Sequence, residues 1–236
     1  MSFFSKIFGK KKTEPQAIVQ DSPEVKSLFE FELRMDTLLA QDRFIARSDF
    51  APICRDFAPL HDTFCKLQST GMLPHFCQTV AIKEERVVKF LSHYSSLSSK
   101  DASEIKQHNK EFINRHLEAD SLYLDNILKK VDPVIKLDDE QRRVVLSDED
   151  YTLVIAGAGA GKTTTIAAKV KYLVEKQGIK PDEIMVISFT NKAVGELRDK
   201  INKALKINCP ITTFHKTGFA ILRRQEPQKL GIVDSA

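Results

Sequence analysis

The residue types best suited to chemistry lie in one short run of small residues, A-G-A-G-A-G-K-T at 156–163. An apolar, β-branched run from Tyr151 to Ala156 predicts a strand before it, and residues 162–176 predict an amphipathic helix after it. A phosphate-binding loop needs this context. Small residues let backbone N–H groups wrap closely around a triphosphate, and the N-terminus of the following helix favours negative charge. Lys162 is therefore expected to reach the β- and γ-phosphates, and the Thr163 hydroxyl to bind Mg²⁺.

One position departs from the pattern G-x-x-x-x-G-K-[ST], because Ala156 stands where the pattern has glycine. Alanine fits there only where the backbone avoids positive φ. The alternative is a tight strand-to-helix turn that binds nothing, but Lys162 and Thr163 stand where phosphate binding needs them. The expected nucleotide contacts in this stretch are Ala156, Gly157, Ala158, Gly159, Ala160, Gly161, Lys162, Thr163 and Thr164.

The segments around the loop alternate between helical and strand patterns from Pro133 onward. A short capped helix is expected over 137–145, and further strands over 183–189 and from Thr212 to Phe214. Further helices are expected over 191–207 and 218–224. Alternating strands and helices predict an α/β fold with a parallel sheet and flanking helices.

The first part of the chain has a different character. Residues 1–22 are predicted to be a basic tail and linker, and residues 23–133 an all-helical region, because apolar residues recur at helical spacing. The tail is either a short amphipathic segment that contacts anionic lipid or a DNA backbone, or a solvated tail. Its small apolar area favours the solvated tail.

The composition excludes several classes of protein. A net charge of +4 is compatible with nucleic acid but does not argue for it. No apolar run approaches the length of a transmembrane helix, so stable membrane insertion is not expected. The four cysteines are widely spaced, which predicts reduced thiols and a cytoplasmic location. The pair His61 and Cys65 offers too few ligands for a metal site, so core packing is the favoured interpretation.

A phosphate loop alone does not distinguish kinases, GTPases, ATPases and motors. Asn191-Lys192-Ala193-Val194 begins like the guanine-reading element N-K-x-D, but valine replaces its carboxylate. The GTPase interpretation therefore fails.

Four segments in order resemble the superfamily 1 DNA helicases of the UvrD/Rep type: Gln141, residues 156–163, S-F-T-N-K-A at 188–193 and T-T-F-H at 212–215. The resemblance covers about residues 137–224. It implies an ATP-dependent 3′ to 5′ helicase with ATP and Mg²⁺ as cofactors and single-stranded or partial-duplex DNA as partner. It also implies that Gln141 reads the adenine edge and that a phosphate loop beginning with alanine is ordinary.

The same resemblance implies a set of DNA contacts: Phe189, Thr190, Asn191, Thr213, Phe214 and His215. An aromatic ring can stack on a base of any sequence, as a motor walking along DNA requires. The alternatives are that Phe189 is the last core residue of its strand and that His215 caps or packs against a helix.

The helical region resembles, more loosely, the approach to the motor in helicase IV-like proteins, which implies an accessory region. Its residues Lys100, Lys106, Lys110 and Arg115 form either a phosphate-facing stripe or a solvated helix face. Protein partners cannot be predicted.

The family also has an Asp-Glu pair at the end of a later strand and a second motor domain. Asp182-Glu183 and Asp148-Glu149-Asp150 precede their strands and do not fit that pair. Residues 134–236 are therefore expected to be the incomplete N-terminal part of a RecA-like motor domain, which binds ATP without appreciable turnover. The alternative is a stand-alone nucleotide-binding or partner-docking module without helicase activity.

Overall fold

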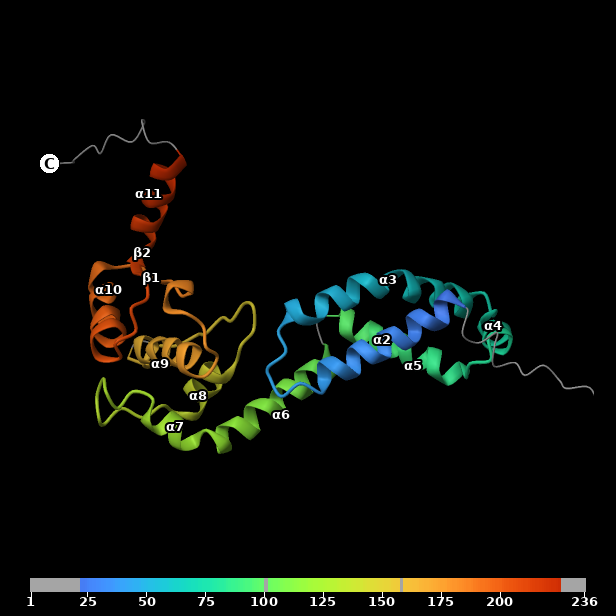
Figure 1. The fold of residues 1–236 in the computed structure, drawn as a ribbon, viewed down its shortest axis with the longest axis horizontal. Coiled ribbons are helices and arrows are strands. Elements are labelled where there is room, and N and C mark those ends of the chain that lie inside the picture. The colour runs from blue at the N-terminus through green and yellow to red at the C-terminus, as the bar shows by residue number, and fades with distance from the viewer. Residues whose placement is uncertain (1–21, 100–101, 158, 226–236) are drawn as a thin grey trace, which may run out of the picture. The chain divides into compact units, whose positions relative to one another are not determined.

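The computed structural model describes residues 22–99, 102–157 and 159–225 (Figure 1). The chain divides between Phe112 and Ile113 into two compact units. We call the described residues up to Phe112 the N-terminal unit and those from Ile113 onward the C-terminal unit. The division falls within helix α6 (Ser103–Ala119). Ala158 and the tail residues 1–21 lie outside the described residues, as does Lys100.

Helices α2 (Pro23–Leu39), α3 (Arg47–Ser69), α4 (Leu73–Thr79) and α5 (Glu84–Ser98) make up most of the N-terminal unit, which confirms its predicted helical character. Buried residues recur every three or four positions, and this spacing puts them on one face of each helix. Phe31, Phe57, Phe64 and Phe90 meet edge to face where α2, α3 and α5 pack together. These rings form the centre of the core.

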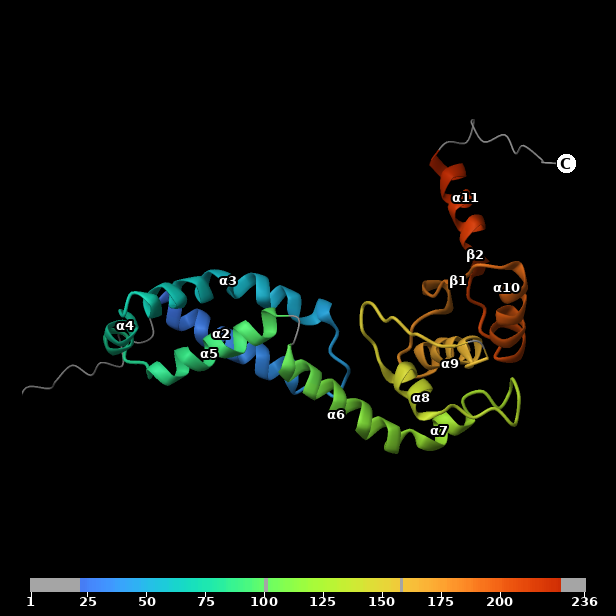
Figure 2. The same cartoon turned by 180° about the vertical axis from the view of Figure 1, so that it is seen from behind.

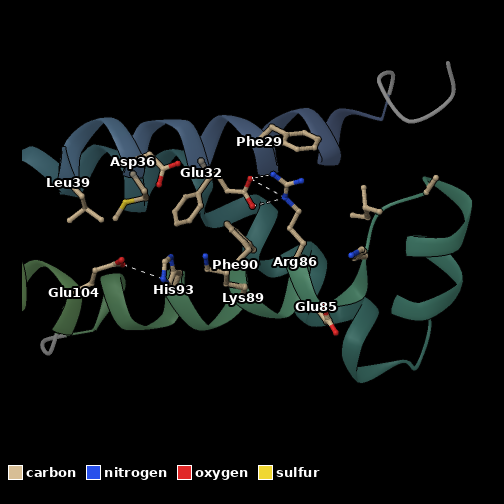
Figure 3. Close-up of a pocket in the computed structure, with 15 residues that line it drawn as sticks. Phe29, Glu32, Asp36, Leu39, Glu85, Arg86, Lys89, Phe90, His93 and Glu104 are labelled. Carbon is tan, nitrogen blue, oxygen red and sulfur yellow. Dashed lines mark hydrogen bonds and ion pairs between the residues drawn. The ribbon is translucent and has the colours of Figure 1, made fainter. Parts of the chain in front are cut away.

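A groove of about 660 Å³ runs between α2 and α5 (Figure 3). The guanidinium of Arg86 forms a two-pronged ion pair with Glu32 across it and lies over the ring of Phe29, 4.1 Å from its centroid. Closer to α6, His93 pairs with Glu104 at 3.4 Å. These contacts join three helices of the N-terminal unit along one side.

The C-terminal unit has a small parallel sheet with helices. Its elements after α6 are α7 (Ser121–Asn126), α8 (Asp139–Leu146), α9 (Lys162–Glu175), a 3₁₀ turn η1 (Pro181–Glu183), β1 (Val186–Ser188), α10 (Asn191–Arg198), a π-helical turn η2 (Asp199–Ala204), β2 (Ile211–Thr213) and α11 (Phe214–Gln225). Strands β1 and β2 pair in parallel, with Val186 opposite Ile211 and Ser188 opposite Thr213. The crossover between them contains α10, as a β-α-β unit requires.

The buried core of this unit lies among α8, α9, α10 and the strands. Figures 1 and 2 show the ribbons of these elements from two sides. Val145 and Leu146 of α8 and Ala167 and Ala168 of α9 have no exposed surface. The side chain of Arg198 donates a hydrogen bond to the Ile211 carbonyl at 2.7 Å, which ties α10 to β2. The core therefore fixes α8 and α9 against the sheet-bearing part of the unit.

The predicted strand over 151–156 is wrong. These residues belong to no strand, and Tyr151, Leu153 and Ile155 are 92%, 86% and 89% exposed. A β-branched run needs a neighbouring strand for its backbone hydrogen bonds. Within the described residues the sheet consists of β1 and β2.

Other predicted boundaries shift without changing the type of element. The strand predicted over 183–189 shrinks to β1, because residues 181–183 form a 3₁₀ turn after Pro181. The helix predicted over 191–207 becomes α10 followed by the π-helical turn. Helix α11 begins earlier than predicted, so Phe214 lies in a helix rather than a strand. None of the helices in the described part of the chain is long and apolar enough to cross a membrane.

Candidate nucleotide-binding site and nucleic-acid interface

The loop before α9 has the backbone conformation that its glycines predict. Gly159 and Gly161 have φ of +78° and +75°, a region that alanine avoids. Ala156 is absent from the described non-glycine residues with positive φ, so it meets the condition for alanine in a glycine slot. Gly161 is the N-cap of α9 and accepts hydrogen bonds from the backbone N–H and hydroxyl of Thr165. Helix α9 therefore begins directly after the loop.

Lys162 reaches back over this loop. Its Nζ donates hydrogen bonds to the carbonyl oxygens of Ala156 at 3.1 Å and Gly157 at 2.6 Å. The ammonium therefore bridges the carbonyls of the first two residues of the loop. Thr163 follows in the first turn of the helix, where backbone N–H groups lack partners within the helix. This arrangement suits an anion.

The side chain of Gln141 contacts the loop from α8. Its Nε2 donates a hydrogen bond to the Ala160 carbonyl at 3.2 Å, and a Cβ added at Gly161 would lie 2.6 Å from the same nitrogen. The amide of Gln141 therefore occupies the space that a side chain at position 161 would take. The structure brings together the predicted adenine-reading glutamine and the phosphate loop, which lie far apart in the sequence.

The orientation of Gln141 follows from its place in a capping box. Its backbone N–H donates to the Asp138 carboxylate at 2.8 Å, and its Oε1 accepts from the Asp138 N–H at 3.1 Å. This reciprocal pair begins α8 and fixes which end of the amide faces the loop. The short helix predicted at this place is confirmed.

Two residues near the loop were not predicted from the sequence. Lys200, in the π-helical turn, has its Nζ 3.4 Å from the Thr164 hydroxyl, one turn into α9. Lys169, further along α9, donates to the backbone carbonyls of Val145 and Ser147 at the end of α8. Both contacts join distant segments, and no local motif contains them.

The predicted DNA contacts gather where the two parallel strands end. Phe189 follows β1 and His215 follows β2, and their ring centroids are 6.3 Å apart in an edge-to-face arrangement. Phe189 is 80% exposed and Phe214 is 70% exposed. The alternative in which Phe189 ends its strand as a core residue is therefore wrong. Two exposed phenylalanines and a histidine here suit stacking on bases.

The two threonines among these residues cap helices. The Thr190 hydroxyl accepts from the Ala193 N–H at 3.2 Å and begins α10, while the Thr213 hydroxyl accepts from the Lys216 N–H at 3.3 Å in α11. Thr213 is also buried. Asn191 is exposed in the first turn of α10. Contact of these three residues with DNA stays a prediction.

Carboxylates near the site are placed as the sequence predicts. Asp182 and Glu183 lie in the 3₁₀ turn before β1, not at its carboxyl end. Within the described residues, no group of three or more His, Cys, Asp or Glu side chains could hold a metal ion.

Comparisons with known proteins bear on the C-terminal unit. Residues 137–233 match the family model of the UvrD/REP helicase N-terminal domain. A probable DNA helicase II homolog of Mycoplasma capricolum is 41% identical over 91 residues, which are 37% of this chain and 12% of that protein. ATP-dependent DNA helicase UvrD1 of Mycobacterium leprae is 36% identical over 38% of this chain and 12% of its own length.

ATP-dependent DNA helicase PcrA of Staphylococcus aureus is 33% identical over 96 residues, which are 39% of this chain and 13% of that protein. The chain thus covers about an eighth of the length of these relatives. The resemblance drawn from the four sequence segments is confirmed for this part of the chain.

Proposed function

We propose, from the match of residues 137–233 to the UvrD/REP helicase N-terminal domain, that this chain carries the ATP-binding part of a DNA helicase. The single observation that carries the proposal is the contact of Gln141 Nε2 with the Ala160 carbonyl. It joins a base-reading group to a phosphate loop in one site. We further propose that the parent motor is RecA-like and moves 3′ to 5′ on single-stranded DNA.

The phosphates of ATP would lie between the loop and the first turn of α9. The backbone N–H groups of Gly157 to Thr163 and the Lys162 ammonium would hold them. The two carbonyls that Lys162 contacts are neutral, so they attract its ammonium less strongly than negatively charged phosphate oxygens would. Lys162 is therefore expected to exchange these carbonyls for phosphate oxygens when ATP binds.

Magnesium would be held by the Thr163 hydroxyl together with phosphate oxygens. When bound, the ion offsets negative charge on the β- and γ-phosphates. Thr163 lies in the first turn of α9, next in sequence to Lys162, so the two side chains can serve the same phosphate group. Thr164, whose hydroxyl faces Lys200, completes the proposed contacts.

Single-stranded DNA would lie across the carboxyl ends of β1 and β2. Phe189 and His215 are already in contact there, and Phe214 follows β2 directly. Bases stacked on exposed rings would be bound without regard to sequence. Thr190, Asn191 and Thr213 are proposed to position the backbone around these rings.

The test is a titration of the chain with fluorescent ATP in the presence of Mg²⁺. Replacing Lys162 by alanine removes charge-assisted contacts, so we expect affinity to fall by about tenfold or more. Lys203→Ala is the matched control, because this lysine is 78% exposed and forms an ion pair with Asp199, four residues before it. Equal affinity in the wild type and Lys162→Ala would exclude the phosphate loop as the site.

A parallel titration with a labelled oligonucleotide separates the helicase from a stand-alone nucleotide-binding module. A helicase should bind single-stranded DNA more tightly than blunt duplex. ATP binding without any preference for single strands supports the module.

A further inference from the structure

Two lysines of α9 contact the two segments that form the proposed site, one lysine for the phosphate loop and one for helix α8. Lys162 and Lys169 lie about two turns apart on α9, so their side chains leave the helix in nearly the same direction. Lys162 contacts the carbonyls of the phosphate loop. Lys169 donates to the carbonyls of Val145, at 3.0 Å, and Ser147, where α8 ends.

No backbone group within α8 can replace the hydrogen bonds that Lys169 donates. The last carbonyls of a helix have no partner within it, and a cation there also interacts favourably with the helix dipole. The Lys169 side chain is 23% exposed and has Asp148 as a more distant partner at 3.7 Å. Burial lowers the pKa of Lys169, and Asp148 acts in the opposite direction. The hydrogen bonds of Lys169 therefore offset the cost of removing its ammonium from water.

The direction of α8 depends on such contacts. An eight-residue helix is too short to be stable alone in water. Its last two residues, Val145 and Leu146, pack fully buried against α9. Lys169 fixes the same end by hydrogen bonds, which are more directional than apolar packing.

The opposite end of α8 carries Gln141. A glutamine amide offers a donor and an acceptor side by side, which match N7 and the N6 amino group of adenine. Guanine presents two acceptors at the same edge and would set O6 against the glutamine oxygen. The Ala160 carbonyl uses one Nε2 hydrogen of Gln141, which leaves the other hydrogen and an Oε1 lone pair for a base.

We propose that Lys169 is a positioning residue that holds α8 so that Gln141 stays against the phosphate loop and the site prefers adenine to guanine nucleotides. The inference rests on the proposed function, because it takes Gln141 as the base-reading group. It adds a residue that does not touch the nucleotide and a specificity that depends on it.

The test compares affinities for ATP and GTP, with Mg²⁺ present, in the whole chain and in Lys169→Met, Gln141→Ala and the double variant. Methionine keeps an unbranched side chain that is one atom shorter and removes the hydrogen-bond donors. We expect the ratio of ATP to GTP affinity to fall about tenfold in each single variant. The ratio in the double variant should be no lower than the ratio in Gln141→Ala, because both changes act through one contact. An unchanged ratio in Lys169→Met, or losses that multiply, overturns the proposal.

Lys203→Met is the control for loss of a lysine in the same unit, and its ratio should stay that of the wild type. Amide hydrogen exchange provides a readout without nucleotide: exchange across α8 should speed up in Lys169→Met while α10 stays unchanged. If the wild type binds neither nucleotide, the proposed function fails, but the exchange result still decides the positioning role. Unchanged exchange in α8 overturns it. Should Lys169→Met not fold, Lys169→Gln takes its place under the same criteria.

Discussion

The amide nitrogen of Gln141 lies 3.2 Å from the carbonyl oxygen of Ala160 and joins α8 to the phosphate loop. The same side chain closes the capping box with Asp138. One residue therefore stabilises its own helix and restrains the loop. Its replacement should therefore affect both the stability of the fold and the binding of nucleotide.

Replacing Gln141 by alanine should lower both properties by different amounts. The capping box loses the bond to the Asp138 N–H, at a cost of about 1 kcal/mol in the free energy of unfolding. Affinity for ATP should fall about tenfold, because the base contact is lost. Urea denaturation and nucleotide titration measure the two effects. The control variant is Glu183→Ala, which removes a similar hydrogen bond from the backbone N–H of Lys180 to the Glu183 carboxylate.

The left-handed backbone at Gly161 gives a second prediction. A Cβ there would meet Gln141 Nε2 at 2.6 Å, while Gly178, with φ of +70°, has nothing within 4 Å. Alanine at either position strains the backbone by about 1 kcal/mol. We expect Gly161→Ala to weaken ATP binding as well, because the Gln141 amide must move away from the loop. Gly178→Ala should lose stability only. Equal binding in both variants would contradict the role of the close approach.

The exposed rings at the ends of β1 and β2 predict a DNA-binding defect. Stacking of a base on an aromatic ring contributes about 1–3 kcal/mol, so Phe189→Ala should weaken binding of single-stranded DNA about tenfold or more. Fluorescence anisotropy of a labelled oligonucleotide measures this change. Leu122→Ala, which removes a 73% exposed side chain of α7, is the control. Binding that depends equally on both residues would indicate a non-specific apolar effect.

Asp120 predicts a pH dependence of stability in the C-terminal unit. Burial alone would raise the pKa of its carboxyl, but hydrogen bonds from Lys176 and His116 outweigh burial and lower the pKa. A lowered folded-state pKa adds stability that is present above the unfolded value near 3.8 and is lost as pH falls through the folded value. Asp120→Asn should therefore lower the free energy of unfolding by about 1 kcal/mol at neutral pH. Below pH 3 the difference should shrink; a constant difference across this range would show that charge has no part in it.

The sequence correctly predicted those structural features that depend only on residues close together in the chain. Asp138 and Gln141 form the expected helix start, and Gly161 takes the conformation that only glycine adopts easily. The run from Tyr151 to Ala156 has strand composition, but a strand exists only with a hydrogen-bonded neighbour, and a local pattern does not contain that information. The boundary of the helical region predicted at residue 133 stays a prediction.

The site was predictable as a set of motifs but not as a geometry. The order of the four segments identified Gln141, the loop, Phe189 and His215, and the structure brings them together in two pairs. Lys169 and Lys200 could not be found in this way, because each contacts a residue of another helix. Lys169 of α9 contacts Val145 of α8, and Lys200 of η2 contacts Thr164 of α9. The burial of Thr213 likewise follows from packing rather than from its motif.

The most direct test of the proposed ATP site is amide hydrogen exchange of the whole chain with and without Mg²⁺ and ATP. Nucleotide held as proposed should slow exchange in the peptides covering residues 156–165 and in the first turn of α8, where Gln141 lies. The same peptides should be protected much less in Lys162→Ala at the same ATP concentration, if that concentration is close to the wild-type Kd. Protection confined to other segments, or equal protection in Lys162→Ala, would contradict the account.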